Sequence, residues 1–184
     1  MKKVIAFVLA AVLVCLTVSA LAVSGPSKSE LTPFKFEKRK DGIGLGTCPV
    51  YSAPYSDAYR ANNGKASCAT NSYIDIGGFE RGWLFVRYET NNGSWRVGWI
   101  PSKYVHDVKT PMTPHFTYIR QVAGETIDVS DNNLSANERS SIFWTLRPGD
   151  EYYVLAYYDY YGYDQYYIEF SMYGQTARGF IPMY

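Results

Sequence analysis

The residues with the strongest intrinsic chemistry are three cysteines and two histidines, at Cys15, Cys48, Cys68, His106 and His115. A cysteine nucleophile needs a histidine base beside it, and a structural zinc site needs four ligands of these types. The sequence has no C-x-x-C pair, and both histidines lie in segments with the character of linkers. We therefore expect no catalytic residue, no metal site and no cofactor.

Carboxylates are numerous enough to supply the pair of acids that glycoside cleavage uses, since the chain has 17 Asp and Glu residues. Such a pair works in a deep cleft, which small β domains rarely provide. We therefore expect a binding protein rather than an enzyme.

Aromatic side chains are the other group with a clear chemical use, because the chain contains 18 Tyr, 9 Phe and 4 Trp residues. Aromatic faces stack on sugar rings or on Pro-rich peptides, while the Tyr OH and Trp NH groups orient the ligand. Ten of the tyrosines lie in 152–173. Tyrosine also favours strands, where cross-strand pairs stabilise a sheet. We expect the structural role within strands, and ligand contact by the loop residues Tyr160, Tyr161 and Tyr163.

The N-terminus has the three parts of a bacterial export signal. Two lysines precede an apolar run at 4–18, and the A-x-A pattern of a signal peptidase site follows at 20–22. We predict a signal peptide at 1–22 and a secreted or cell-envelope protein. The alternative is an uncleaved membrane anchor, because 4–23 is long enough to span a bilayer.

The charge of the remaining chain argues against a nucleic-acid partner. Removing 1–22 leaves 162 of the 184 residues, with 16 basic residues against 17 acidic ones. Phosphate binding needs a dense positive surface, which this balance does not provide. The length allows one ordinary domain or two very small ones.

Cys48 and Cys68 are an even pair in a chain with an export signal, and disulfides persist in exported proteins. Cys48 precedes a predicted strand and Cys68 begins another, so a bond would join neighbouring strands. We predict this disulfide. The alternative is a pair of buried free thiols.

Two segments divide the chain, and the two parts end alike. A polar spacer is predicted at 23–42 and a Pro-containing linker at 108–114, which leaves domains at 43–107 and 115–184. The first part closes with Arg-Val-Gly-Trp-Ile-Pro at 96–101 and the second with Ala-Arg-Gly-Phe-Ile-Pro at 177–182. This predicts two copies of one small fold.

Alternation of apolar and polar residues indicates strands in both parts. In 83–89 one set of alternate residues is aliphatic or Tyr, so we expect one buried and one partly solvated face. A turn at 91–93 leads to a returning strand at 94–100, and the second part repeats this hairpin at 167–181. The predicted class is all-β.

The motif at 98–105 follows the pattern Gly, aromatic, aliphatic, Pro, Ser, polar, Tyr, Val, and resembles the closing segment of SH3 domains. The strand that begins at Trp83 is similar to another SH3 strand. With the export signal, and with 50–54 and 57–66, the sequence resembles the bacterial SH3-like (SH3b) family of secreted and cell-wall proteins from Gram-positive bacteria. This resemblance implies two tandem SH3-like barrels, the second of which lacks a counterpart of Tyr104. In such barrels Gly98 and Gly179 would lie at close strand crossings where a Cβ would clash.

The resemblance also implies an aromatic ligand groove. Carried over by position, the groove residues are Tyr51, Tyr55, Trp83, Pro101 and Tyr104, with Tyr59 and Arg60 beside them. Each could instead belong to the core or to plain surface. The expected function is non-catalytic binding of cell-wall polymer, either peptidoglycan peptide or glycan. The alternative is recognition of an extended or Pro-rich segment of an exported partner protein.

Overall fold

A computed structural model describes residues 25–39, 47–68, 74–105, 116–132, 141–158 and 164–183. The predicted signal peptide, the linker at 108–114, both histidines and the loop residues Tyr160, Tyr161 and Tyr163 lie outside these ranges. Thirteen of the sixteen regular elements in the described ranges are strands, which confirms the all-β class.

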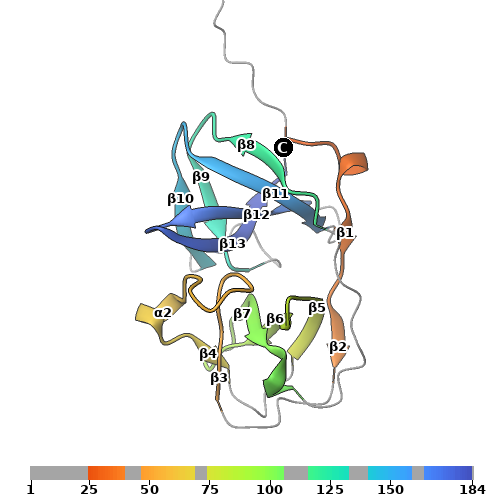
Figure 1. The fold of residues 1–184 in the computed structure, drawn as a ribbon, viewed down its shortest axis with the longest axis vertical. Coiled ribbons are helices and arrows are strands. Elements are labelled where there is room, and N and C mark those ends of the chain that lie inside the picture. Colours follow the sequence, from red (N-terminus) through yellow and green to blue (C-terminus); the bar gives the residue numbers. More distant parts are fainter. Residues whose placement is uncertain are drawn as a thin grey trace, which may run out of the picture.

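The first unit, residues 47–105, is built on one antiparallel sheet (Figure 1). Its strand order is β2 (Glu37–Arg39), β5 (Ile74–Glu80), β6 (Trp83–Glu89) and β7 (Trp95–Pro101). A second, two-stranded sheet pairs β3 (Cys48–Pro49) with β4 (Ser67–Cys68), and the short helical turn α2 (Ala61–Gly64) lies between them in sequence. A 3-10 turn, η2 (Ser102–Tyr104), follows β7.

The second unit, residues 116–183, contributes six strands to a seven-stranded sheet: β8 (Ile119–Val122), β9 (Ile127–Ser130), β10 (Ile142–Leu146), β11 (Glu151–Tyr158), β12 (Gln165–Met172) and β13 (Gln175–Pro182). The order is β1, β11, β12, β13, β9, β10, with β8 also paired to β11 and β1 (Pro33–Phe34) coming from the N-terminal segment. Among the described residues no ring of paired strands closes on itself, so the prediction of two closed barrels is not confirmed.

The surroundings of Gly98 and Gly179 are alike, as the predicted repeat requires. A Cβ on Gly98 would lie 2.4 Å from Val50 Cγ1, and one on Gly179 would lie 2.6 Å from Val129 Cγ1. Each glycine also faces a backbone oxygen, at 3.0 and 2.9 Å respectively, which cannot move aside as a flexible side chain can. The two units therefore cross strands in the same way at the predicted glycines.

The predicted hairpins are present in both units, as β6 with β7 and as β12 with β13. Most described tyrosines of 152–173 serve the core, since Tyr152, Tyr158, Tyr166 and Tyr167 are buried. Tyr153 is exposed on β11, and Tyr173 is the most exposed, with 79% of its surface accessible in the turn between β12 and β13.

The two units pack through equivalent faces of these hairpins. Phe85 pairs with Trp99 across β6 and β7, and Tyr167 pairs with Phe180 across β12 and β13. The Phe85 and Tyr167 ring centroids are 4.8 Å apart, and Trp99 Nε1 donates to Tyr167 Oη at 2.7 Å. All four side chains are fully buried, so the face of β6 expected to be partly solvated is covered by the second unit.

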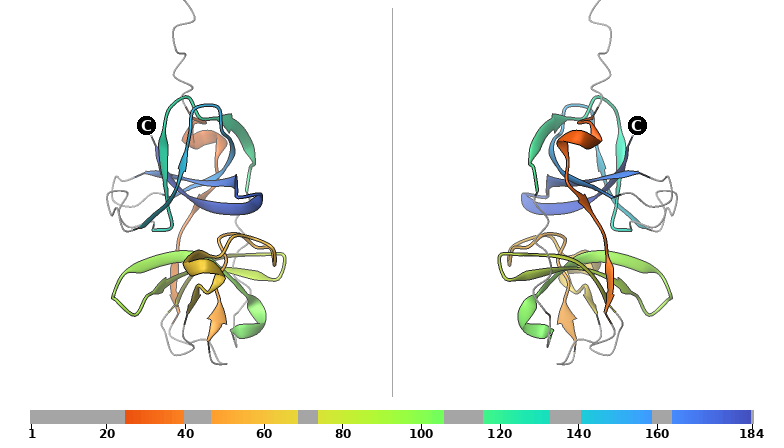
Figure 2. Two further views of the ribbon diagram at one scale, coloured as in Figure 1. Left: turned by 90° about the vertical axis from the view of Figure 1, so that its left-hand side faces the viewer. Right: turned by 90° about the vertical axis from the view of Figure 1, so that its right-hand side faces the viewer.

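The segment predicted as a polar spacer is part of the fold. Residues 25–39 form an N-terminal strap that runs alongside both units (Figure 2). The strap's β1 pairs in parallel with β11 of the second unit, and its β2 pairs with β5 of the first. Phe34 is buried in the aromatic layer between the units, and Leu31 packs in the core of the second. The prediction missed this role because the apolar residues of the strap are isolated rather than periodic.

Arg178 lies at the centre of the layer between the units, with a fully buried side chain. Its Nη1 bonds Glu80 of the first unit at 2.7 Å, and its Nε bonds Glu169 of the second at 2.8 Å. Its Nη2 donates to Tyr118 Oη at 2.8 Å, and its guanidinium lies 5.2 Å from the centre of the Trp99 ring. Burial opposes the charge, but Tyr167 and the two carboxylates outweigh it and raise the pKa of Arg178. This cation therefore joins both units.

Cys48 and Cys68 lie opposite each other on β3 and β4, as predicted, and both are buried. The disulfide is not formed in this structure: both are free thiols, with their sulfur atoms 3.1 Å apart. The hydrogen bond between them lowers the pKa of Cys48 and raises that of Cys68. A lower pKa increases the fraction of Cys48 that is present as the reactive thiolate.

We predict that Arg178→Met destabilises the protein by about 3–5 kcal/mol, because the substitution leaves two carboxylates facing the aromatic layer without their cation. Urea unfolding monitored by Trp fluorescence measures this loss. Arg120→Met is the matched control, because the Arg120 and Glu151 side chains of its ion pair are more than half exposed. Equal stability of the two variants would contradict the central role of Arg178.

We predict that a mild oxidant such as oxidised glutathione converts the Cys48 and Cys68 thiols into a disulfide, since opposed Cα positions on paired strands suit the bond. Intact mass after alkylation, with and without prior reduction, decides the matter. Alkyl groups should be added only after reduction, and replacing both cysteines should then lower stability by about 2–4 kcal/mol. Addition of two alkyl groups without reduction would show free thiols instead.

Candidate functional site

Several residues named by the SH3 resemblance lie together in the first unit. The Tyr51 and Trp83 rings meet edge to face with centroids 5.0 Å apart, and Trp83 pairs with Pro101 across β6 and β7. The Arg60 guanidinium lies 4.9 Å from the centre of the Tyr51 ring. The structure therefore brings four of the predicted residues into one group.

Tyr55 lies where the second unit covers this group. Its ring centre is 5.2 Å from the guanidinium of Arg81 and 5.9 Å from that of buried Arg178. Trp83 packs against the same aromatic layer between the units. The second unit thus closes part of the groove that the resemblance implies.

Tyr104 is not brought into the group. It packs against the core cluster of the first unit, whose members include Leu84 and Ile100. Because Leu84 and Trp83 are neighbours on β6, they point to opposite faces of the sheet. Tyr104 is therefore associated with the face opposite to that of Trp83, so the structure separates a pair that sequence reasoning had placed together.

A cleft of about 510 Å³ opens between the first-unit loop that leads into α2 and the turn between β12 and β13. We call it the inter-unit cleft. Its lining residues include Tyr51, Asp57, Tyr59, Arg60, Tyr173 and Gln175. Three of these, Tyr51, Tyr59 and Arg60, are predicted site residues.

Tyr173 and Gln175 are the lining residues that sequence reasoning missed as a site. Gln175 Nε2 donates to the Asp57 carbonyl oxygen at 3.1 Å, and the Tyr59 N–H donates to the Thr176 carbonyl at 3.1 Å. These bonds hold the turn against the loop. Tyr173 has φ 51°, a left-handed conformation that is uncommon for a tyrosine, and it presents its ring to solvent. The sequence feature that could have indicated this site is Tyr173 next to Gly174 in a tight turn.

Contacts with neighbouring residues hold the Arg60 guanidinium and the Tyr59 ring in place at the cleft. Arg60 Nη2 donates to the Ala66 carbonyl at 2.8 Å, while its buried Nε has no hydrogen-bond partner. The Tyr59 ring stacks on Phe143 of the second unit, at 6.1 Å and an interplanar angle of 11°. Burial, followed by Tyr173 and Asp131, raises the pKa of Tyr59, so its hydroxyl stays protonated and can donate a hydrogen bond.

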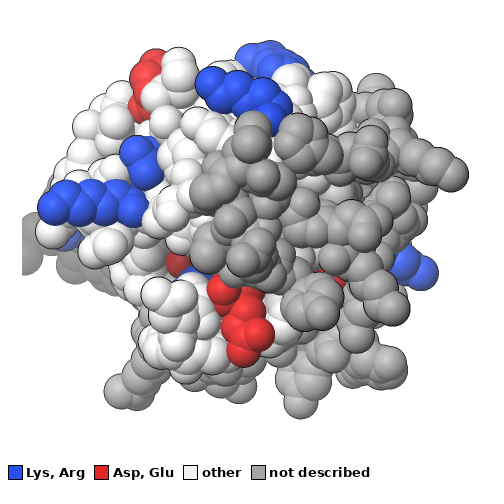
Figure 3. Space-filling view, turned by 90° about the horizontal axis from the view of Figure 1, so that it is seen from below, with Lys and Arg blue, Asp and Glu red and all other residues white. Residues whose placement is uncertain are grey.

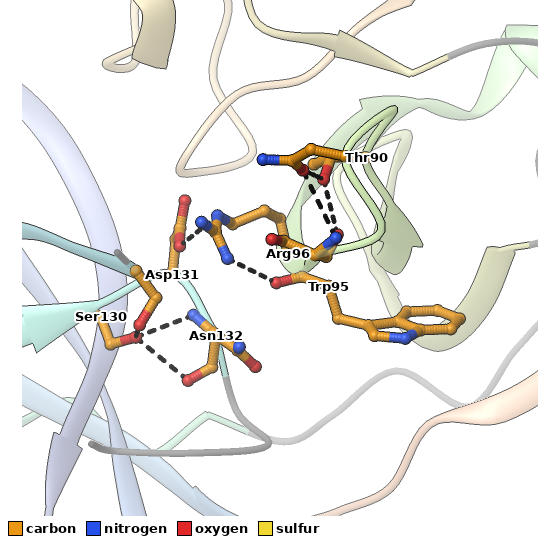
Figure 4. Close-up of polar contacts among 9 residues, drawn as sticks. Thr90, Trp95, Arg96, Ser130, Asp131 and Asn132 are labelled. Carbon is orange, nitrogen blue, oxygen red and sulfur yellow. Dashed lines mark hydrogen bonds and ion pairs between the residues drawn. The ribbon is translucent and has the colours of Figure 1, made fainter. Parts of the chain in front are cut away.

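An ion pair supports the same junction (Figure 4). Arg96 Nε of β7 lies 3.1 Å from Asp131 Oδ1 of the second unit, and the Asp131 carbonyl accepts the Val97 N–H at 2.7 Å. Burial raises the pKa of Asp131 to about 7, although Arg96 acts in the opposite direction. A carboxyl group that titrates near neutrality therefore lies within the contact between the units.

Nowhere in the described part of the chain do three or more His, Cys, Asp and Glu side chains gather as they would around a metal ion. On the first-unit end of the molecule, seen in Figure 3, basic and acidic side chains of the described residues are dispersed. No helix in the described ranges is long and apolar enough to cross a membrane.

Comparison of the chain with models of protein families found no matching family, and searches of curated proteins and of solved structures found no match either. The SH3b resemblance therefore stays a prediction from sequence motifs, and function is argued from the chain's own geometry.

We predict that part of the stability is lost as the pH rises from about 4 to about 7. The folded protein retains a proton on Asp131 to about pH 7, whereas the unfolded chain releases it near pH 4, so the folded state binds more protons in this window. At ~1.4 kcal/mol per pKa unit, the loss is at most about 4 kcal/mol. Urea unfolding at several pH values should show a smaller fall for Asp131→Asn. An identical pH dependence in the two proteins would contradict the assignment.

Proposed function

We propose that the protein is an exported, non-catalytic binding protein that holds cell-envelope polymer, peptidoglycan peptide or glycan, in the inter-unit cleft. One observation carries this proposal: three residues singled out by the resemblance, Tyr51, Tyr59 and Arg60, line one cleft together with the exposed ring of Tyr173. An exposed aromatic ring at a cleft is typical of a binding surface.

The chemistry of the cleft suits a polar polymer that carries both hydroxyl and amide groups. Tyrosine rings provide stacking faces, and the phenol hydroxyls fix the orientation of a ligand. Arg60 and Asp57 supply a donor and an acceptor of opposite charge, so the cleft favours neither a strongly anionic nor a strongly cationic ligand. Its volume of about 510 Å³ lies within the ordinary range of ligand pockets.

Rigidity of the cleft follows from the contact between the units. Its two walls come from different units, and the aromatic layer and Arg178 fix one unit against the other. A preformed cleft loses little conformational entropy when it binds a ligand. Weak single contacts are therefore sufficient when they repeat along a polymer.

The alternative function is recognition of a Pro-rich segment of an exported protein. It requires Trp83, Pro101 and Tyr104 in one groove, as in SH3 domains. Tyr104 instead packs at the first-unit core, while Trp83 packs at the inter-unit layer. The geometry therefore favours the envelope polymer.

Sedimentation with purified cell wall tests the proposal. We expect the wild-type protein to sediment with the wall, and Tyr173→Asn to bind about 2- to 10-fold more weakly, the equivalent of one lost aromatic contact. Asn is chosen because it tolerates the left-handed backbone of residue 173. Tyr153→Asn, at an exposed tyrosine on β11 that does not line the cleft, is the matched control.

Two outcomes would overturn the proposal. Wild-type protein that stays in the supernatant excludes wall binding. Equal weakening by Tyr153→Asn and Tyr173→Asn places the binding surface elsewhere. A pull-down from the secreted fraction that captures one stoichiometric protein partner, without retention on the wall, would support the alternative function.

A further inference from the structure

The second unit has a pocket of its own, distinct from the inter-unit cleft. It has a volume of about 200 Å³ and lies among β9, β10 and the ends of β12 and β13. Its lining includes Asp128, Ser130, Ile142, Gln165, Phe180 and Pro182. At ~30 Å³ per water molecule it has room for about six waters, or for a short side chain.

Strand register shows that this pocket occupies the position of the predicted first-unit groove. Trp83 faces Pro101 across β6 and β7, and Gln165 faces Pro182 across β12 and β13. Gln165 is therefore the structural counterpart of Trp83.

The neighbouring wall shows the same equivalence. Tyr51 pairs with Trp99 in the first unit, and Ser130 pairs with Phe180 in the second. Ser130 thus stands where the first unit has Tyr51. Two aromatic side chains of the first unit are replaced by polar ones in the second, and the replacement leaves space.

The buried side chain of Gln165 lacks a hydrogen bond that buried amides normally make. Only 2% of its surface is exposed, and its Oε1 has no hydrogen-bond partner. A buried acceptor without a donor destabilises the fold, and such groups are rare in folded proteins. A ligand that donates a hydrogen bond from within the pocket would remove this penalty.

The charged residue of the pocket, Asp128, determines which charge on that donor is favourable. Asp128 is the one charged side chain that lines the pocket in the described part of the chain. It is exposed, and it accepts a hydrogen bond from Thr145 Oγ1 at 2.8 Å, which holds the carboxylate in place. Phe180, Ile142 and Pro182 provide apolar walls. The pocket therefore offers one neutral acceptor, Gln165 Oε1, and one anionic acceptor, the Asp128 carboxylate, beside apolar walls. A positively charged donor at the end of an aliphatic chain complements these groups.

We propose that the second-unit pocket binds a primary ammonium group on an aliphatic stem, as found on lysine or a related diamino acid within a peptide. The stem packs on the apolar walls, and the ammonium, which has three donors and no acceptor, bonds Gln165 Oε1 and the Asp128 carboxylate. This site does not depend on the inter-unit cleft, so either proposal can fail alone.

NMR titration of the full exported chain tests this inference with Nα-acetyl-lysine N-methylamide as the probe. With about 0.3 kcal/mol per non-hydrogen atom, this 14-atom probe should bind with a Kd of about 1 mM. The shifted amide signals should include those of Ser130 and Phe180. The norleucine analogue, which lacks only the ammonium, is the matched control and should bind at least tenfold more weakly.

Two substitutions separate binding from folding. Asp128→Asn and Gln165→Met should each weaken binding about tenfold. Gln165→Met should leave the protein equally or more stable to urea, because a methionine places no unpaired polar atom in the pocket. Tyr173→Asn, in the inter-unit cleft, should bind the probe as the wild type does.

The inference is overturned by any of three results: no shifts with the lysine probe, equal affinity for the norleucine analogue, or shifts that both substitutions leave unchanged. Wall sedimentation of Asp128→Asn distinguishes this failure from failure of the proposed function. If the variant sediments as the wild type does, the cleft acts alone.

Discussion

The layer in which Phe85 and Trp99 pack against Tyr167 and Phe180 fixes the rest of the structure. These residues occupy equivalent positions of the two units, so each unit buries the same face of its hairpin against the other. Burial of one large aromatic side chain contributes roughly 1.5–3 kcal/mol, and here such side chains lie on both sides of one layer. Tilting one unit would expose them. The relative orientation of the units, and therefore the inter-unit cleft, follows from this packing.

Arg178 adds directional hydrogen bonds to a layer that is otherwise apolar. Aromatic packing tolerates small rotations, but the guanidinium has donors in a fixed plane and reaches a carboxylate in each unit. A buried cation of this kind contributes more to the uniqueness of the arrangement than to its stability, since separating it from water is costly. We infer that Arg178 sets the register between the units.

The N-terminal strap makes the same arrangement depend on distant parts of the chain. Pro33 and Phe34 pair with Tyr157 and Tyr158, across more than one hundred positions of sequence. Contacts of such separation form late, because the long loop must close first. The strap can therefore join the second sheet only after β11 is in place.

Local features of the fold were predictable from the sequence, and contacts between units were not. Gly98 and Gly179 could be placed at strand crossings because their motifs repeat, and each is surrounded as that placement requires. The alternation of Trp83 and Phe85 with aliphatic residues showed which side chains share a face. It did not show what covers that face, because periodicity contains no information about a partner surface.

The same limit explains which residues of the candidate site could be predicted from the sequence. Tyr51, Tyr59 and Arg60 could be named because they lie within one short stretch that resembles a known motif. Gln175 meets that stretch from 118 residues away, through a bond to the Asp57 carbonyl. No pattern in the sequence connects the two, since their contact exists only because the units pack face to face.

Packing through equivalent faces also explains why the units differ in chemistry at one and the same backbone position. In the first unit the aromatic residues Tyr51 and Trp83 fill this position, and Trp83 packs against the inter-unit layer. In the second unit the counterparts are Ser130 and Gln165, which fill less space and leave a pocket. A Trp at the Gln165 position would occupy the pocket and satisfy no polar group, whereas Gln keeps the pocket open at the expense of an unpaired oxygen. An unpaired buried acceptor that only opens space lowers stability, and a ligand that supplies the missing donor would offset this loss.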